Sequence, residues 1–289
     1  MTSLRDHQSN TLTKLLIIGD PKSGKTGSLV SLVKVGYKLR ILDLDNLLDI
    51  LKYLVLRECP ELIDNVEART LRDKRTTTPL GSVIDGTPTA FINSLKLLDR
   101  WKYDDIDFGK PSDWGPDCIV VIDSLSRLCD AAYDWAETMV PRGKSGDFDA
   151  RAVYGVAQDA IESCLATLTS RSFGTNVIVI AHVQYMDLPD GSKKGFPQGI
   201  GSKLSPKIPS YFPSVVYYKN SNGRRTLQTN SSPLIDCANP APFLMEKEYP
   251  AETGLAQFFG VLRPHPTQET TYPDTTSTPV KPSSTLIRK

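Results

Sequence analysis

The feature that most constrains this chain is the segment Gly19–Thr26, which reads Gly-Asp-Pro-Lys-Ser-Gly-Lys-Thr. It fits G-x-x-x-x-G-K-[S/T], the pattern of a phosphate-binding loop, or P-loop. The apolar residues 15–18 before it predict a buried strand, and residues 26–34 after it predict a helix that ends near Gly36. Because the pattern lies between a strand and a helix, its backbone N–H groups can turn inward toward phosphate oxygens. The sequence therefore predicts binding of a nucleoside triphosphate.

Individual residues of the loop have separate expected roles. Lys25 supplies a full positive charge to the phosphates, and we expect its side chain to point into a solvent-filled site. The Thr26 hydroxyl is expected to face Mg²⁺, so the cofactors that this segment predicts are ATP and Mg²⁺. The run of residues expected to contact the nucleotide is Gly19, Asp20, Pro21, Lys22, Ser23, Gly24, Lys25, Thr26 and Gly27.

Polar side chains follow several of the predicted strands. Cys118–Ile122 is continuously apolar, which indicates burial on both faces within a parallel sheet, and Asp123 comes directly after it. An Asp at this position, downstream of a P-loop, is expected to help hold magnesium. His182 ends the apolar strand 176–182, where it is either a sensor of the nucleotide or a satisfied core histidine.

The predicted strand 39–45 carries two acidic residues near its end. Asp43 and Asp45 share one face of this strand because side chains alternate with a period of two. Asp45 lies nearer the carboxyl end and is the better placed toward a nucleotide. The competing interpretation is an ordinary solvated strand end, and the sequence leaves open which of the two acids is functional.

Apolar strands alternate with helical segments along the chain. This pattern indicates an α/β fold with a mostly parallel sheet that helices cover on both faces. Ligands of such sheets bind at the carboxyl ends of the strands, so we expect Asp45, Asp123 and His182 to converge on the P-loop. Further helices are predicted at residues 47–58, 90–101, 125–139 and 149–169, and short strands at 66–71, 215–218 and 226–229. Polar loops are expected at residues 73–89, 104–117 and 185–209.

The order of these motifs resembles that of the RecA-like recombination ATPases, especially the short phage-encoded branch associated with single-strand annealing. The shared order is a P-loop, a strand ending Ile-Leu-Asp-Leu-Asp, a strand ending Val-Val-Ile-Asp-Ser, and then Val-Ile-Val-Ile-Ala-His. Stretches at 157–159, 204–207 and 239–242 are also similar to that branch. The resemblance covers residues 12–262 and implies a RecA-like ATPase domain at residues 12–263.

The resemblance implies a role for each polar strand end. Asp45 occupies the place of a water-activating Glu and is one methylene shorter. Asp123 corresponds to the magnesium-holding Asp, and His182 to a sensor that reports the γ-phosphate to a DNA-binding loop. The expected catalytic residues are Asp45, Lys25 and His182, and the expected metal ligands are Thr26 and Asp123. Where relatives have lysines that reach a neighbouring subunit's ATP, this chain has Gln228, Thr229 and Asn230.

The loop after His182 is the predicted contact to single-stranded DNA. Lysines there could neutralise phosphates, and the interleaved aromatic rings could stack on bases. The expected DNA-binding residues are Tyr185, Lys193, Lys194, Phe196, Lys203 and Lys207. Glycines in the loop suit a segment that orders only when DNA arrives. Ordinary solvated loop charges are the competing interpretation. The implied partners are single-stranded DNA, further copies of the chain in a ring or filament, and a single-strand-binding protein.

Composition limits the location and the domain organisation. Five cysteines at irregular spacing favour reduced thiols in the cytoplasm, which is the host cytoplasm for a phage protein, and argue against a zinc site. No apolar run is long enough to span a membrane. A net charge of +1 means that any nucleic-acid surface must be a local patch. We expect a flexible N-terminus at residues 1–11 and a disordered Ser/Thr/Pro-rich tail at residues 264–289.

Two other functions share the same core. A helicase-type DNA motor has the same fold, and strand displacement driven by ATP would distinguish it from annealing. A nucleotide kinase with a P-loop should carry an Arg-rich lid over its second substrate, whereas Arg142 and Arg151 are sparse here. The sequence does not separate annealing, strand exchange and loading of a partner.

Overall fold

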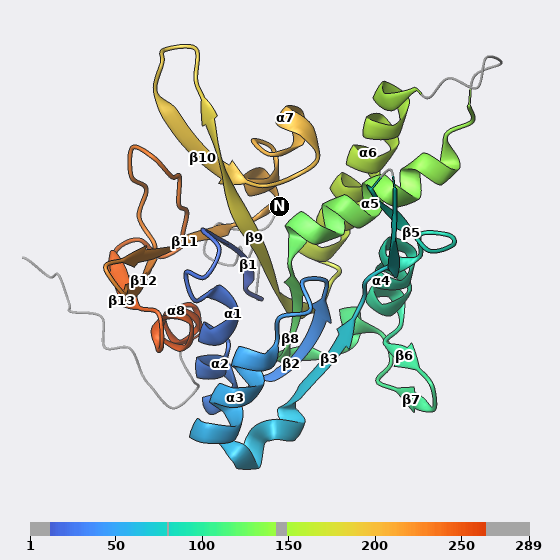
Figure 1. Cartoon of the computed structure of the whole chain (residues 1–289). Coiled ribbons are helices and arrows are strands. Elements are labelled where there is room, and N and C mark those ends of the chain that lie inside the picture. The colour runs from blue at the N-terminus through green and yellow to red at the C-terminus, as the bar shows by residue number, and fades with distance from the viewer. Residues whose placement is uncertain (1–11, 80, 143–148, 264–289) are drawn as a thin grey trace, which may run out of the picture.

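The computed structural model describes residues 12–79, 81–142 and 149–263. The expectations for the N-terminus at residues 1–11 and for the tail at residues 264–289 lie outside these residues. Within them, the chain forms a central sheet with helices on both sides and two small two-stranded hairpins (Figure 1).

The central sheet is mostly parallel. Its strands, in the order in which they lie side by side, are β13 (Glu248–Pro250), β12 (Arg224–Gln228), β11 (Ser214–Ser221), β1 (Lys14–Gly19), β9 (Thr175–Asp187), β8 (Gly115–Asp123), β2 (Lys38–Asp43) and β3 (Val66–Thr70). The strands from β11 to β3 pair in parallel. β12 and β13 run antiparallel at one edge. β9 therefore lies between the strand that leads into the P-loop and the strand that ends in Asp123.

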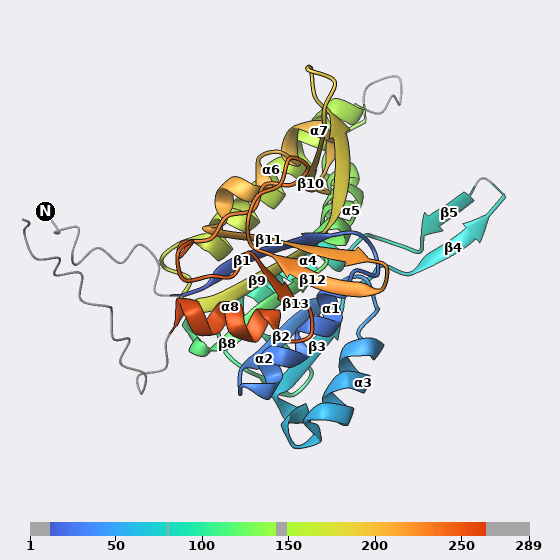
Figure 2. The same ribbon diagram turned by 90° about the vertical axis from the view of Figure 1, so that its left-hand side faces the viewer.

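Helices cover both faces of this sheet. They are α1 (Lys25–Ser28), α2 (Val30–Lys34), α3 (Asp49–Glu58), α4 (Ala90–Asp99), α5 (Leu125–Met139), α6 (Ala150–Thr169), α7 (Gly201–Leu204) and α8 (Gly254–Leu262). Figure 2 shows α5 and α6 on one face and α1, α2, α3 and α8 on the other. The alternation in β1 explains both layers: Leu16 and Ile18 pack in the core with α4, α5 and α6, and Leu15 and Ile17 pack in the opposite core. The predicted fold class, an α/β core with a mostly parallel sheet that helices cover on both faces, is confirmed.

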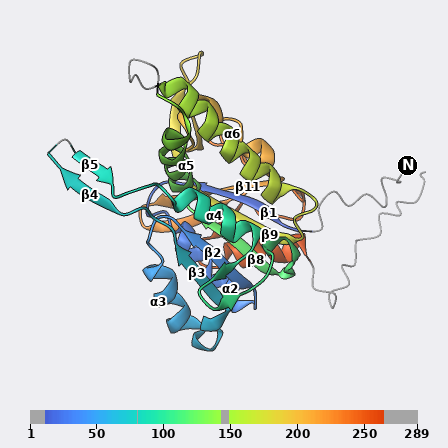
Figure 3. The ribbon, with the colours of Figure 1, turned by 90° about the vertical axis from the view of Figure 1, so that its right-hand side faces the viewer.

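Residues 73–89 are not the irregular loop that their polar composition predicts. They contain a hairpin of β4 (Arg75–Thr78) and β5 (Gly81–Ile84), which projects away from the body of the protein (Figure 3). Threonine is β-branched and suits extended backbone, so a polar Thr run can form a solvated hairpin. A second, shorter hairpin of β6 (Lys102–Tyr103) and β7 (Ile106–Asp107) overlaps the other predicted loop at 104–117.

The predicted long loop at residues 185–209 was also wrong. β9 continues past His182 to Asp187 and pairs antiparallel with β10 (Lys193–Pro197), and the short helix α7 follows. We call β9 from Val183 onward together with β10 the β9–β10 hairpin. Gly191, with a φ of 80°, lies in the turn of the hairpin, a backbone conformation that glycine adopts without strain. A hairpin and a short helix thus replace most of the predicted irregular loop.

Among the described residues, no helix combines the length and the apolar character that crossing a membrane requires.

Candidate nucleotide-binding site

The P-loop connects the end of β1 to the first turn of α1. Gly24 has a φ of 100° immediately before α1, a backbone conformation that glycine adopts without strain. Gly19 is required for space, because a methyl group at this position would lie 2.6 Å from the carbonyl oxygen of Tyr218 on β11. The glycines of the motif therefore allow a tight turn against a neighbouring strand, and the N–H groups that follow remain available for phosphate oxygens.

Lys25 does not extend into solvent as the sequence led us to expect. Its side chain is 6% exposed, and its Nζ donates to the carbonyl oxygens of Gly19 and Asp20, each at 2.8 Å. Burial lowers the pKa of Lys25 to about 8, although the carboxylate of Asp123 acts in the opposite direction. In this conformation the ammonium group donates hydrogen bonds to loop carbonyls. It must break these bonds to reach an arriving phosphate.

Thr26 and Asp123 face each other as a magnesium site requires. The Thr26 hydroxyl donates to Oδ2 of Asp123 at 2.6 Å, and Asp123 is buried at the end of β8. Burial raises the pKa of Asp123 to about 6, the nearby charges of Asp45 and Asp43 act in the same direction, and the bond from Thr26 opposes them. A hydroxyl and a carboxylate at this separation fit Mg²⁺, which proteins commonly hold with one or two carboxylates together with phosphate oxygens.

Asp123→Asn is expected to stabilise the nucleotide-free fold at pH 7 while weakening the response to magnesium. The pKa of about 6 in the folded state exceeds the ordinary 3.8. The folded chain therefore holds this proton more tightly, so the contribution of Asp123 to stability falls as pH rises from about 4 to about 6. The variant should gain up to about 3 kcal/mol at pH 7. Thermal unfolding at pH 4.5 and at pH 7.5 measures this effect, and an equal change at both pH values would contradict it.

Asp43 and Asp45 do not share a strand face, because β2 ends at Asp43. The carboxylate of Asp43 accepts from the backbone N–H of Asn46 at 2.7 Å and from the Thr70 hydroxyl at 3.3 Å, so it holds the turn after β2. Asp45 instead faces the site. Its carboxylate accepts from Nε of Arg127 at 3.2 Å and lies 3.4 Å from Nε2 of His182.

The pKa of Asp45 lies below its ordinary value. Burial opposes ionisation, but hydrogen bonds from His182 and Ser124, together with the positive charge of Arg127, outweigh that effect. Asp45 is therefore a carboxylate held in place from two sides, by α5 and by β9. Sequence reasoning missed Arg127, although its place in the first turn of the helix after Asp123 was a usable signal.

His182 links the nucleotide site to the β9–β10 hairpin. It pairs in register with Gly19 of the P-loop strand, and its backbone N–H donates to Oγ of Ser126 at 3.1 Å. Its Nδ1 is buried and has no hydrogen-bond partner among the described residues. The predicted convergence of Asp45, Asp123 and His182 near the P-loop is what the structure shows.

The predicted DNA-binding residues lie on more than one element. Tyr185, Lys193, Lys194 and Phe196 belong to the β9–β10 hairpin, whereas Lys203 lies on α7 and Lys207 lies beyond it. Several of the lysines already have acidic partners: Lys194 with Asp236 at 2.6 Å, Lys207 with Glu162 at 3.0 Å, and Lys193 with Asp187 at 4.0 Å.

Tyr185 has a second connection to the P-loop that the sequence did not suggest. Its hydroxyl lies 3.3 Å from the hydroxyl of Tyr217 on β11. The Tyr217 hydroxyl in turn donates to Oδ2 of Asp20 at 3.2 Å. The hairpin is therefore attached to the nucleotide site through this chain of hydroxyls as well as through His182.

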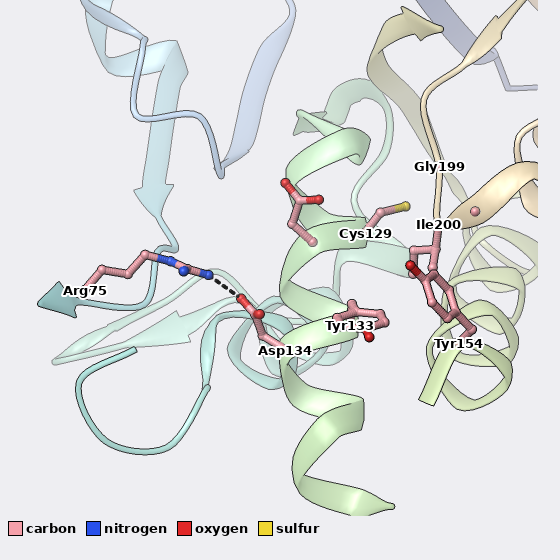
Figure 4. A pocket seen from close by; sticks show the side chains of 9 residues that line it. Arg75, Cys129, Tyr133, Asp134, Tyr154, Gly199 and Ile200 are labelled. Carbon is pink, nitrogen blue, oxygen red and sulfur yellow. Dashed lines mark hydrogen bonds and ion pairs between the residues drawn. The ribbon is translucent and has the colours of Figure 1, made fainter. Parts of the chain in front are cut away.

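A pocket of about 380 Å³ lies beside α5, outside the P-loop. Figure 4 shows Arg75 of β4 reaching Asp134 of α5, while Tyr133 and Tyr154 bring their rings together across the pocket. Asp130, which also lines the pocket, accepts from Nη1 of Arg127, the residue that holds Asp45. A second cavity of about 500 Å³ lies against α4, α5 and α6, and neither cavity is lined by a P-loop residue.

Fold and site together define a P-loop nucleoside triphosphatase. A mostly parallel sheet places the P-loop, Asp123 and a polar residue of the intervening strand at one edge, which is the arrangement for binding and hydrolysing a nucleotide. The family described as "AAA domain" matches residues 11–240, and the chain belongs to this family.

Among solved structures, the chain is similar to a prototypical ATPase from the type III secretion system of pathogenic bacteria. The two share 12% sequence identity with a TM-score of 0.39, and the match covers 72% of this chain and 52% of that one. The chain thus spans about half the length of that ATPase. No curated protein sequence matches this chain.

Proposed function

We propose that this chain is an ATP-hydrolysing DNA recombination protein that binds single-stranded DNA, of the phage-type annealing and strand-pairing branch. It uses ATP with Mg²⁺, assembles as a ring or filament of identical chains, and works in the cytoplasm, in contact with a single-strand-binding protein. The observation that carries the proposal is the unbroken course of β9. One strand runs from beside the P-loop, through His182, into the hairpin with Tyr185 and Lys193.

The residues around the nucleotide divide the chemistry between them. Lys25 neutralises charge on the phosphates, and the N–H groups of the P-loop orient them. Thr26 and Asp123 would hold Mg²⁺, which would supply further neutralising charge. Asp45 accepts a proton from the attacking water. Arg127 and His182 hold the Asp45 carboxylate in position, so a change at the γ-phosphate also reaches His182 and the strand that carries it.

Coupling to DNA follows from the two connections between the hairpin and the nucleotide site. Asp45 contacts His182 at the base of the hairpin, and Asp20 contacts Tyr217 and through it Tyr185. A nucleotide that draws Lys25 away from the Asp20 carbonyl removes a positive charge from beside Asp20 and Asp45, the two residues at which these connections begin. Binding of a single strand to the hairpin acts on His182 and Tyr185, at the opposite ends of the same two connections. Such coupling is reciprocal: DNA changes the affinity for ATP by the same factor by which ATP changes the affinity for DNA.

Single-strand binding should depend on lysines whose ammonium groups are unpaired or only weakly paired with acidic residues of the chain. Lys193→Ala and Lys203→Ala are each expected to reduce the slope of log K against log salt by about 0.7, the value for one phosphate contact on a single strand. Titration of a labelled oligonucleotide at several salt concentrations measures the slope. Lys207→Ala is the matched control, because the Lys207 ammonium group lies 3.0 Å from Glu162, a closer pair than Lys193 with Asp187 at 4.0 Å. Unchanged slopes in both of the first two variants would contradict the DNA assignment.

A further inference from the structure

Arg225 lies against the P-loop of its own chain. It is on β12, and a methyl group at Gly24 would lie 3.0 Å from Cδ of Arg225 and 3.8 Å from its Nε. The stem of the arginine therefore runs across the glycine that directly precedes Lys25. This contact gives Gly24 a second reason to be glycine, besides its φ of 100°.

The backbone of Arg225 is fixed on both sides. It pairs with Asn220 on β11, and its carbonyl oxygen accepts from the N–H of Ala251 at 3.1 Å. The side chain therefore starts from a rigid position and reaches the P-loop without a movement of the strand. Among the described residues, no carboxylate forms an ion pair with this guanidinium group.

A charged guanidinium group beside a phosphate-binding loop has an obvious chemical partner. Arginine stays protonated and presents a planar set of N–H donors that fits phosphate oxygens. Lys25, the other cation of the loop, is occupied with the carbonyls of Gly19 and Asp20 until phosphate arrives. Arg225 has no such competing bond among the described residues, so it is available at first contact.

We propose that Arg225 is a second phosphate-contacting cation of the nucleotide site, supplied in cis by β12. The proposal rests on nucleotide binding at the P-loop and is independent of DNA. It differs from the arrangement implied by the resemblance, in which lysines after the late strand reach a neighbouring subunit's ATP. The residues at that place are engaged within the chain: Gln228 donates to the Asn230 carbonyl, and Thr229 donates to the Glu246 carbonyl.

The test compares Arg225→Ala and Arg225→Lys with Arg224→Ala, all without DNA. Arg224 is the matched control, because it is an exposed arginine on the same strand whose side chain points to the opposite face. The ligands are ATP, ADP and inorganic tripolyphosphate, each with Mg²⁺. Arg225→Ala should weaken ATP and tripolyphosphate binding by about 10- to 100-fold. Arg225→Lys should recover part of the lost affinity, and Arg224→Ala should bind ATP and tripolyphosphate as wild type does.

Several outcomes would overturn the proposal. Tripolyphosphate binding that is unchanged in Arg225→Ala would assign the contact to base or ribose. An equal loss in Arg224→Ala would reduce the effect to general surface charge. Wild-type ATP binding by Arg225→Ala, while Lys25→Ala binds ATP far more weakly, would reject Arg225 alone and leave the P-loop assignment intact. Absence of ATP binding by wild type would reject both.

A mixing experiment tests whether the contact is made in cis. Lys25→Ala chains retain Arg225, and Arg225→Ala chains retain Lys25. If the arginine served a neighbouring subunit, a mixture would assemble some sites with both residues, and ATP turnover would exceed that of either variant alone. The cis arrangement predicts no gain on mixing at any ratio, and a clear gain would overturn it.

Discussion

Lys25→Ala is expected to weaken binding of Mg²⁺-ATP by about 100-fold, because it removes a charged hydrogen-bond donor from the phosphates. Turnover at saturating ATP should fall by about 10²–10³-fold, since a donor that is positioned before the reaction is lost at the developing charge. Equilibrium binding of a fluorescent ATP analogue and steady-state phosphate release measure the two effects.

The conformation of Lys25 adds a second expectation to this variant. Its ammonium group donates hydrogen bonds to the carbonyl oxygens of Gly19 and Asp20. In the alanine variant only water can hydrogen-bond to these two oxygens, which lowers stability. Burial, however, disfavours the charged form of Lys25, and the variant no longer bears that penalty. These effects oppose each other, and we expect little change in thermal stability.

The matched control is Lys34→Ala, at the end of α2 in the same helical segment. The Lys34 ammonium pairs with Glu58 at 3.1 Å, away from the loop. This variant should bind and hydrolyse ATP as wild type does. Normal ATP affinity in Lys25→Ala, or an equal loss in Lys34→Ala, would contradict the P-loop assignment.

Asp45→Asn is expected to keep ATP affinity and lose about 10²–10⁴-fold in turnover. An amide keeps the shape of the carboxylate and can still accept from Arg127, but it cannot take a proton from water. Because hydrogen bonds and positive charge hold the pKa of Asp45 below its ordinary value, the group is ionised at neutral pH and can accept a proton. Single-turnover hydrolysis after pre-binding of ATP separates this chemical defect from a binding defect.

Asp43→Asn is the control for this variant. Asp43 lies two residues earlier, but its carboxylate holds the turn through Asn46 and Thr70. We expect little change in stability, because an amide oxygen can still accept the Asn46 bond and burial already disfavours the ionised form by raising the pKa of Asp43. Turnover should stay near that of wild type. Full hydrolysis by Asp45→Asn together with a loss in Asp43→Asn would transfer the catalytic role to Asp43.

The sequence was most informative where a pattern is local. Helix α5 spans residues 125–139 as its periodicity predicted, and the apolar runs before Gly19 and Asp123 are the strands of the sheet core. Each of these elements is specified by neighbouring residues, so a short window of sequence contains its signal. The parallel sheet then follows from the alternation of such elements, and with it the edge at which the polar strand ends meet.

The sequence was less informative where distant segments decide the outcome. In the β9–β10 hairpin, the N–H of Gly195 donates to the Leu234 carbonyl at 2.8 Å, and a methyl group at Gly195 would lie 2.3 Å from Cδ1 of Ile235. Its formation therefore involves a segment about forty residues away, which no local pattern reveals. Arg127 and Arg225 look like ordinary surface charges in the sequence. Only the folded arrangement brings Arg127 against Asp45 and Arg225 against Gly24 of the P-loop.

Steady-state ATP turnover, measured with and without single-stranded DNA, tests whether ATP hydrolysis is coupled to DNA binding. Wild-type turnover should rise in a saturable way with single-stranded DNA and should not rise with the same concentration of duplex. His182→Ala should still bind ATP but lose this response, because it separates Asp45 from the strand that continues into the hairpin. Turnover that is the same at every concentration of single-stranded DNA would contradict the coupling of ATP hydrolysis to single-stranded DNA.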